Sequence, residues 1–169
     1  YIDNAGAAHS QGLEATADIQ ISDYLTLNIG ADINEAELDE AVGTSPAGTR
    51  LPNAPEWSWS AMLDYGIPLD SGREFNLTLN YSAMGAQDSS LGVENTDGQV
   101  VSAFVFPRRQ TTDFSAHFRG ENDRWKASLF IKNLTGEEAE TAYYNILAVN
   151  QWAWQPPRLV GVEFMMRAQ

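Results

Sequence analysis

The feature that most constrains this chain is a strict alternation of apolar and polar residues in seven segments. The clearest segment is Trp125–Lys132, in which Trp125, Ala127, Leu129 and Ile131 alternate with mostly polar residues. Side chains of a strand point alternately to opposite faces, so each segment predicts a strand with one apolar and one polar face. The predicted strands cover residues 13–21, 25–34, 57–65, 75–82, 113–119, 125–132 and 159–167.

The connections between these strands alternate strictly between short and long. Residues 22–23, 68–72 and 120–123 carry Gly, Pro, Asn, Asp or Ser and predict tight turns. Residues 35–55, 85–110 and 134–157 predict long loops. An antiparallel up-and-down barrel with tight turns at one rim and long loops at the other has this order, which a sandwich rarely keeps.

Charge is absent from the central part of every predicted apolar face. A Lys or Arg at the lipid midplane costs about 2–4 kcal/mol, so this exclusion indicates transmembrane strands. Aromatic residues near the predicted strand ends are typical of membrane interfaces; they are Tyr24, Trp57, Trp59, Tyr65, Phe75, Tyr81, Phe114, Phe118 and Trp125. The polar face is predicted to line a lumen with Glu14, Asp18, Asp32, Asp64, Asp113, His117, Lys126, Lys132 and Glu163.

Two other architectures fit the alternation. A soluble β-sandwich would bury the apolar faces in a core and could bind carbohydrate through Trp152 and Trp154. A small complete outer-membrane barrel would be a structural protein or a passive channel. Bacterial single-chain barrels have even strand numbers, so seven strands predict that the sequence is a piece of a longer one. Such a piece should aggregate when expressed alone, because its edge strands would be unpaired.

Composition excludes several functions. With 10 Lys+Arg against 23 Asp+Glu the net charge is −13, which disfavours nucleic acid as a partner. There are no cysteines and only two histidines, so no metal, cofactor or catalytic centre is predicted, and the protein is not expected to be an enzyme. His117 and Ser115 share a face but lack a hydrolase motif. The acidic run at residues 35–40 is predicted to be a solvated loop. Asn95–Gly98 is predicted to be a turn.

Four motifs, in order, resemble those of the TonB-dependent outer-membrane receptors. His9–Ala15 is similar to a strand start of that family, and Arg50–Ser58, with two prolines, is similar to a loop-to-strand segment. Phe130–Glu138 resembles the end of the penultimate strand and Pro157–Phe164 the closing strand. These motifs span essentially the whole chain. The ending Met165–Gln169 departs from the family, whose barrels usually finish on an aromatic residue.

The resemblance implies that residues 1–169 are the C-terminal portion of a 22-stranded barrel whose lumen holds an N-terminal plug. Such transporters have a plugged lumen. The implied location is the bacterial outer membrane, and the implied function is TonB-energised uptake of a scarce nutrient, most commonly an iron-siderophore complex. The implied partners are TonB, the plug domain, outer-membrane lipid and lipopolysaccharide, and the small-molecule substrate; the plug and the TonB-contacting segment are not in these residues.

The last long connection carries the candidate substrate contacts. Aromatic side chains stack on flat ligands at low entropic cost, so this loop predicts either a substrate site on the outer side or interfacial packing. The candidates are Tyr143, Tyr144, Trp152, Trp154 and Arg158. Phe130 is an exception to the pattern, because it is an apolar residue on the polar face, and contact with the plug is the expected explanation.

Overall fold

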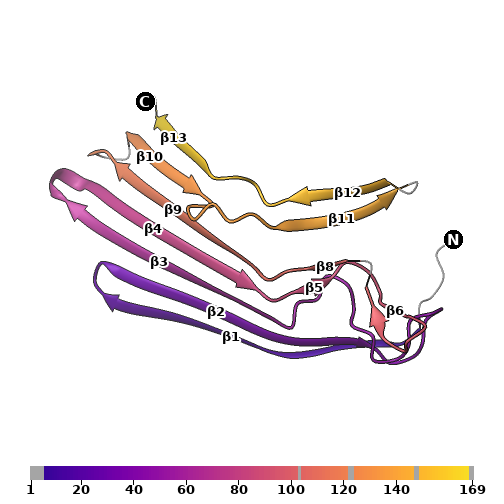
Figure 1. Ribbon diagram of the computed structural model, residues 1–169. Coiled ribbons are helices and arrows are strands. Elements are labelled where there is room, and N and C mark those ends of the chain that lie inside the picture. The colour runs from indigo at the N-terminus through magenta and orange to yellow at the C-terminus, as the bar shows by residue number, and fades with distance from the viewer. Residues whose placement is uncertain (1–5, 103, 122–123, 147–148, 168–169) are drawn as a thin grey trace.

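Seven long strands form one antiparallel sheet in the computed structural model, which describes residues 6–102, 104–121, 124–146 and 149–167 (Figure 1). Their order is β1-β2-β3-β4-β9-β10-β13, so consecutive long strands lie side by side and the predicted up-and-down arrangement is confirmed. The bounds are β1 Ala8–Ser22, β2 Leu25–Leu38, β3 Trp57–Leu69, β4 Arg73–Met84, β9 Arg109–Arg119, β10 Trp125–Lys132 and β13 Leu159–Met166.

The first hairpin is longer than its sequence pattern indicates. β1 and β2 pair from Ala8 opposite Leu38 down to the turn, whereas β3 joins β2 only from Trp57, opposite Ile33. Residues 35–38, predicted to be loop, are therefore strand. The strand extends this far because its backbone has hydrogen-bond partners beyond β3. Leu38 donates its N–H to the Thr49 carbonyl at 2.9 Å, and a backbone group that is hydrogen-bonded avoids the free-energy cost of an unpaired one.

Short and long connections lie at opposite ends of the sheet (Figure 1). A short 3-10 turn, η1 (Asp70–Gly72), joins β3 to β4, with Ser71 and Gly72 in the left-handed region at φ 67° and 69°. Asn122 and Asp123 of the third predicted turn lie outside the described residues. At the long-connection end, the described residues form three pairs of short strands that had not been expected in detail: β5 Gln87–Asp88 with β8 Val105–Phe106, β6 Val93–Glu94 with β7 Val100–Val101, and β11 Glu140–Ile146 with β12 Val149–Trp154.

The apolar face of the sheet is continuous across all seven strands. Directly opposed residues share a face, and the register lines up one central row: Ile19, Leu27, Leu63, Leu79, Phe114, Ile131 and Val160. Within the described part of the chain no second layer covers this face, and Val162 remains 82% exposed. The soluble-sandwich alternative is therefore wrong, because a sandwich needs a second sheet over the apolar side chains.

Aromatic side chains on the apolar face form two bands. Trp57, Trp59 and Tyr81 lie toward the long connections, and Phe118 stacks on Trp125 at 5.3 Å between centroids toward the short turns. Phe114 does not belong to either band, because it lies in the central row. The expectation that Phe114 marks a strand end is thus wrong.

Among the described residues no helix has the length and apolarity needed to cross a membrane.

Candidate functional site

The opposite face of the sheet gathers the polar side chains. All nine residues predicted to line a lumen lie on this polar face. The strand register places each of them opposite residues of the same face in the neighbouring strand. Glu14 lies opposite Asp32, and Asp18 opposite Asn28. Asp64 accepts a hydrogen bond from the Thr78 hydroxyl at 2.7 Å. The face thus combines charge with small hydrogen-bonding groups.

His117 makes a hydrogen bond across the sheet, but not with the serine singled out in the sequence. Its Nδ1 lies 2.9 Å from Oγ of Ser128, the residue directly opposite in β10. Ser115 is opposite Thr78 and Phe130 instead. The arrangement consequently ties β9 to β10 and does not assemble a nucleophile with a base and a third orienting group.

The apolar exception Phe130 has a structural partner. Gly161 is its direct neighbour in β13, and a Cβ atom at Gly161 would overlap the Phe130 ring. An aromatic ring laid over a cross-strand glycine fills the space that the missing side chain leaves and protects the backbone. Packing within the sheet therefore accounts for Phe130 without the plug contact that was expected.

A buried asparagine organises the start of the last long connection. Asn133 follows β10, adopts φ 50° and is only 3% exposed. Its side-chain Nδ2 donates to the carbonyls of Glu137 at 2.8 Å and Pro156 at 3.0 Å, while its Oδ1 accepts from the Glu137 N–H at 2.8 Å. Asparagine tolerates the left-handed conformation and offers both donor and acceptor. One side chain thereby holds together both ends of the connection.

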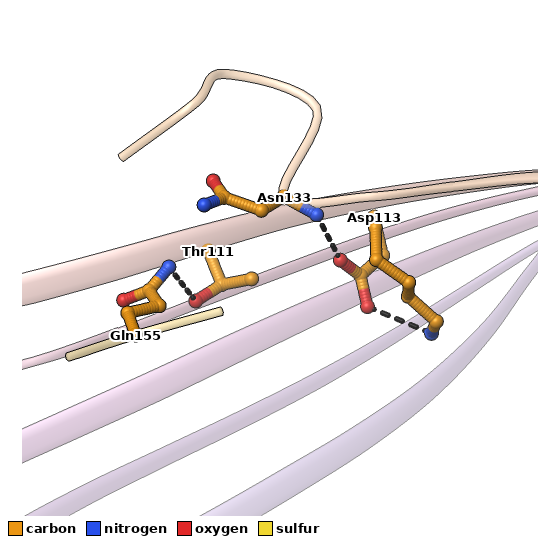
Figure 2. Close-up of polar contacts among 5 residues, drawn as sticks. Thr111, Asp113, Asn133 and Gln155 are labelled. Atoms are coloured by element: carbon orange, nitrogen blue, oxygen red, sulfur yellow. Dashed lines mark hydrogen bonds and ion pairs between the residues drawn. The ribbon is translucent and has the colours of Figure 1, made fainter. Parts of the chain in front are cut away.

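The same corner is anchored to β9 by charge and by a second amide (Figure 2). Asp113 accepts hydrogen bonds from the Lys132 ammonium at 2.8 Å and from the Asn133 N–H at 2.9 Å. Gln155, at the other end of the connection, donates to Thr111 Oγ1 at 3.1 Å. These contacts hold the base of the β11–β12 hairpin against the sheet. They therefore position the side chains of the hairpin relative to the sheet.

Two of the five candidate substrate contacts are part of an aromatic cluster. Tyr143 and Trp152 are cross-strand partners with ring centroids 4.6 Å apart. Phe104, from the preceding long connection, lies 4.5 Å from Trp152 and 5.9 Å from Tyr143, and also contacts the buried Phe106. The cluster joins two long connections, so Tyr143 and Trp152 have a packing role whatever else they do.

The other three candidates lie apart from that cluster. Tyr144 and Trp154 are 57% and 56% exposed on the β11–β12 hairpin. Arg158 lies at the hairpin base, where its Nη2 would be 2.8 Å from a Cβ at Gly136. The sequence prediction missed Phe104 and Phe106, although the uninterrupted apolar run Phe104-Val105-Phe106 was a usable signal for a packed short strand.

Two carboxylates of the acidic run at residues 35–40 make local contacts. Glu35 accepts a hydrogen bond from Gln11 at 2.9 Å, and Asp39 lies 2.6 Å from His9 Nδ1. No group of three or more His, Cys, Asp or Glu suited to a metal ion occurs in the described residues. Asn95 Oδ1 accepts from the N–H groups of Asp97 and Gln99, which confirms the turn predicted at Asn95–Gly98.

An open antiparallel sheet with one uninterrupted apolar face, one polar face and long connections at a single end defines the wall of a membrane-type β-barrel. The family model described as TonB dependent receptor-like, beta-barrel matches residues 1–134. The chain therefore belongs to that family, and the resemblance noted in the sequence is confirmed.

Two solved structures show the same fold. The ferric yersiniabactin uptake receptor FyuA from Yersinia pestis matches with a TM-score of 0.75 and 19% identity, over 95% of this chain and 24% of that one. BauA, the ferric preacinetobactin receptor from Acinetobacter baumannii, matches with a TM-score of 0.66 and 15% identity, over 96% and 22%. The chain thus spans about a quarter of the length of these receptors. No curated protein matches it.

Proposed function

We propose that the chain is the C-terminal portion of the barrel of an outer-membrane receptor that imports a scarce nutrient with energy from TonB. The observation that carries the proposal is the match of the family to a sheet whose apolar face is uncovered across seven strands. In this assignment the apolar face contacts lipid, the polar face lines a lumen filled by a plug domain, and the long connections lie outside the cell.

A ferric siderophore is the proposed substrate class. The two solved relatives are receptors for ferric yersiniabactin and ferric preacinetobactin, which supports this choice. The exposed rings of Tyr144 and Trp154 project from a hairpin held rigidly at its base, and such rings stack on flat organic ligands. Trp152 and Tyr143 then support the contact surface, and Arg158 adds a positive charge beside it.

Uptake by the full-length receptor tests the proposal. A host carrying the gene, the same host with the gene deleted, and a host lacking TonB should be compared for accumulation of labelled ferric siderophore. Uptake should require both the gene and TonB. Equal uptake after deletion would contradict siderophore import, whereas gene-dependent uptake that persists without TonB would favour a passive channel.

Variants of the hairpin test the site separately. Tyr144→Ala and Trp154→Ala should weaken substrate binding by about tenfold or more each, since stacking contacts contribute about 0.5–1.5 kcal/mol beyond area burial. The receptor should still reach the outer membrane in normal amount. Leu159→Ala, at an exposed position below the hairpin, serves as the matched control and should leave binding unchanged.

A further inference from the structure

A hollow rich in positive charge lies at the short-turn end of the sheet, where β9, β10 and β13 meet (Figure 1). Its volume is about 300 Å3, and pockets that bind small molecules generally have about 300–1,000 Å3. The lining includes Trp125 and Met165 together with four basic residues, which we call the basic cluster: Arg119, Arg124, Lys126 and Arg167.

The strand register brings the basic cluster together on the polar face. Lys126 lies directly opposite Arg119 in β9 and Met165 in β13. Nearer the turn, Arg167 donates its backbone N–H to the Arg124 carbonyl at 2.9 Å, so the β10–β13 ladder continues to these two residues. Residues that are directly opposed, or two apart along a strand, share a face. The cluster therefore lies on the face that carries the carboxylates and not on the apolar face.

Most of the positive charge in the hollow is not neutralised by a carboxylate. Arg119 Nη1 lies 3.3 Å from Oε2 of Glu74 in the neighbouring strand β4. Arg124, Lys126 and Arg167 form no ion pair within the residues that the structure describes, and the described lining contains no acidic residue. A hollow lined by charges of one sign concentrates ions of the opposite sign. The basic cluster therefore favours an anion, in a chain whose net charge is −13.

The rest of the polar face directs anions toward this corner. The charged residues of the polar face in β1–β3 are all carboxylates, namely Glu14, Asp18, Asp32 and Asp64. An anion beside the polar face is repelled by these strands and attracted by the basic cluster, which lies in the other half of the sheet. The charge distribution thus points to one place on this face for a negatively charged ligand.

We propose that the basic cluster is a binding site for a compact polyanion with two or more carboxylate or phosphate groups. Guanidinium groups bind the oxygens of such groups through paired N–H donors, and an ammonium adds a point charge. Four cations from three neighbouring strands can engage more than one anionic group at once, and the volume of the hollow suits a small molecule. The proposal rests on the lumen placement given under Proposed function, which puts the site at the inner mouth of the lumen.

The experiment measures binding of radiolabelled citrate, a compact tricarboxylate, to the purified full-length receptor by equilibrium dialysis in an uncharged detergent. Unlabelled pyrophosphate is the competitor with several negative charges, and acetate at matched ionic strength is the competitor with one. The test variant combines Arg124→Gln with Lys126→Gln. The matched control combines Arg73→Gln with Arg108→Gln, because these two exposed arginines do not line the hollow and their loss changes the net charge equally.

Wild-type receptor should bind citrate saturably, and pyrophosphate but not acetate should displace it. The test variant should bind citrate about tenfold more weakly, because it loses two partly exposed charge contacts. The matched control should bind like wild type, and so should the charge-conserving variant Arg124→Lys with Lys126→Arg. Four results would overturn the proposal: no saturable binding by wild type, equal binding by the test variant, an equal loss in the matched control, or equal displacement by acetate.

Uptake of labelled ferric siderophore by the same variants in cells identifies the source of the polyanion. Slower uptake by the test variant, with normal substrate binding at the cell surface, would identify the imported chelate as it leaves the lumen. Normal uptake despite lost citrate binding would identify a free anion of the compartment at the short-turn end. Both results support the polyanion site. A wild-type receptor that imports no siderophore would contradict the transport proposal alone, because citrate binding is measured separately.

Discussion

The polar faces of the two halves of the sheet differ in charge and in how well that charge is paired. In β1–β3 the charged residues are all acidic, namely Glu14, Asp18, Asp32 and Asp64, and Glu14 lies directly opposite Asp32. In β9–β13 acids and bases are mixed, and Asp113 binds Lys132 at 2.8 Å. Like charges directly opposite each other destabilise a sheet. The repulsion between acidic residues in the first half must therefore be offset by groups outside that half, whereas the second half pairs charges of opposite sign within itself.

The difference in charge pairing matches the different contacts of the two halves. The second half carries the hairpin that holds the candidate substrate contacts, and it fixes that hairpin through Asn133, Asp113 and Gln155. The first half offers an acidic wall whose charges are available to cations or to a basic segment of another part of the protein. A specific network positions a site, whereas carboxylates that form no ion pair among the described residues favour an exchangeable partner. Four changes in the full-length protein test this contrast.

Replacing the buried asparagine should have the largest effect. Asn133→Ala removes three hydrogen bonds and leaves buried backbone groups unpaired, each of which costs about 1–3 kcal/mol. The connection at residues 133–158 should become sensitive to protease in intact cells, and substrate uptake should fall strongly. Asn53→Ala is the control from the first half, because Asn53 also has positive φ (58°) but is exposed. Equal protease sensitivity in both variants would remove the contrast.

A methyl group at the glycine under Phe130 should have the next largest effect. Gly161→Ala places a Cβ atom where the Phe130 ring lies, and overpacking of this kind costs about 1–3 kcal/mol. The midpoint of urea unfolding in detergent should fall accordingly. Gly30→Ala, in β2, would meet only Ser60 Oγ at 3.2 Å and should change the midpoint much less. A larger loss for Gly30→Ala would show that the second half is not the more tightly packed.

Removing a carboxylate should matter in the second half and not in the first. Asp113→Ala breaks the ion pair with Lys132 and the hydrogen bond from Asn133, which should cost about 1–2 kcal/mol after allowance for the exposed lysine. Asp18→Ala removes a carboxylate of the acidic wall and should leave the unfolding midpoint unchanged or slightly raised. Unfolding of the two purified variants provides the measurement, and equal destabilisation would contradict the comparison.

Reversing one charge of the acidic wall should have the smallest effect. Asp32→Lys converts the opposed pair with Glu14 into an attractive one, worth a few tenths of a kcal/mol to about 1 kcal/mol. The midpoint should rise slightly and the rise should shrink in high salt, because exposed charges are screened. Asp32→Asn separates loss of repulsion from gain of attraction. A fall in the midpoint for Asp32→Lys would indicate that other groups already compensate the wall.

Much of the fold could be predicted because it depends on local periodicity. Alternation with period two assigned the faces of all seven strands, and the order of short and long connections gave the up-and-down arrangement. The turn at Asn95 was predictable for the same reason, since an asparagine side chain bonds its own backbone two residues on. Each of these features is decided by neighbours in the chain.

Tertiary structure decided the features that depend on which strand positions lie opposite one another. The alternation alone left Phe130 unexplained, and only the register of β10 with β13 brings it over Gly161. The stagger of β9 likewise moves Phe114 to the centre of the apolar face.

The same holds for the candidate site. The residue types at 143–158 suggested a contact surface from sequence, but the pairing of β11 with β12 and the approach of Phe104 separate packed rings from exposed ones. Sequence determined which side chains are apolar, polar or aromatic on each strand. Their partners were decided by pairings between segments distant in the chain, which no local pattern encodes.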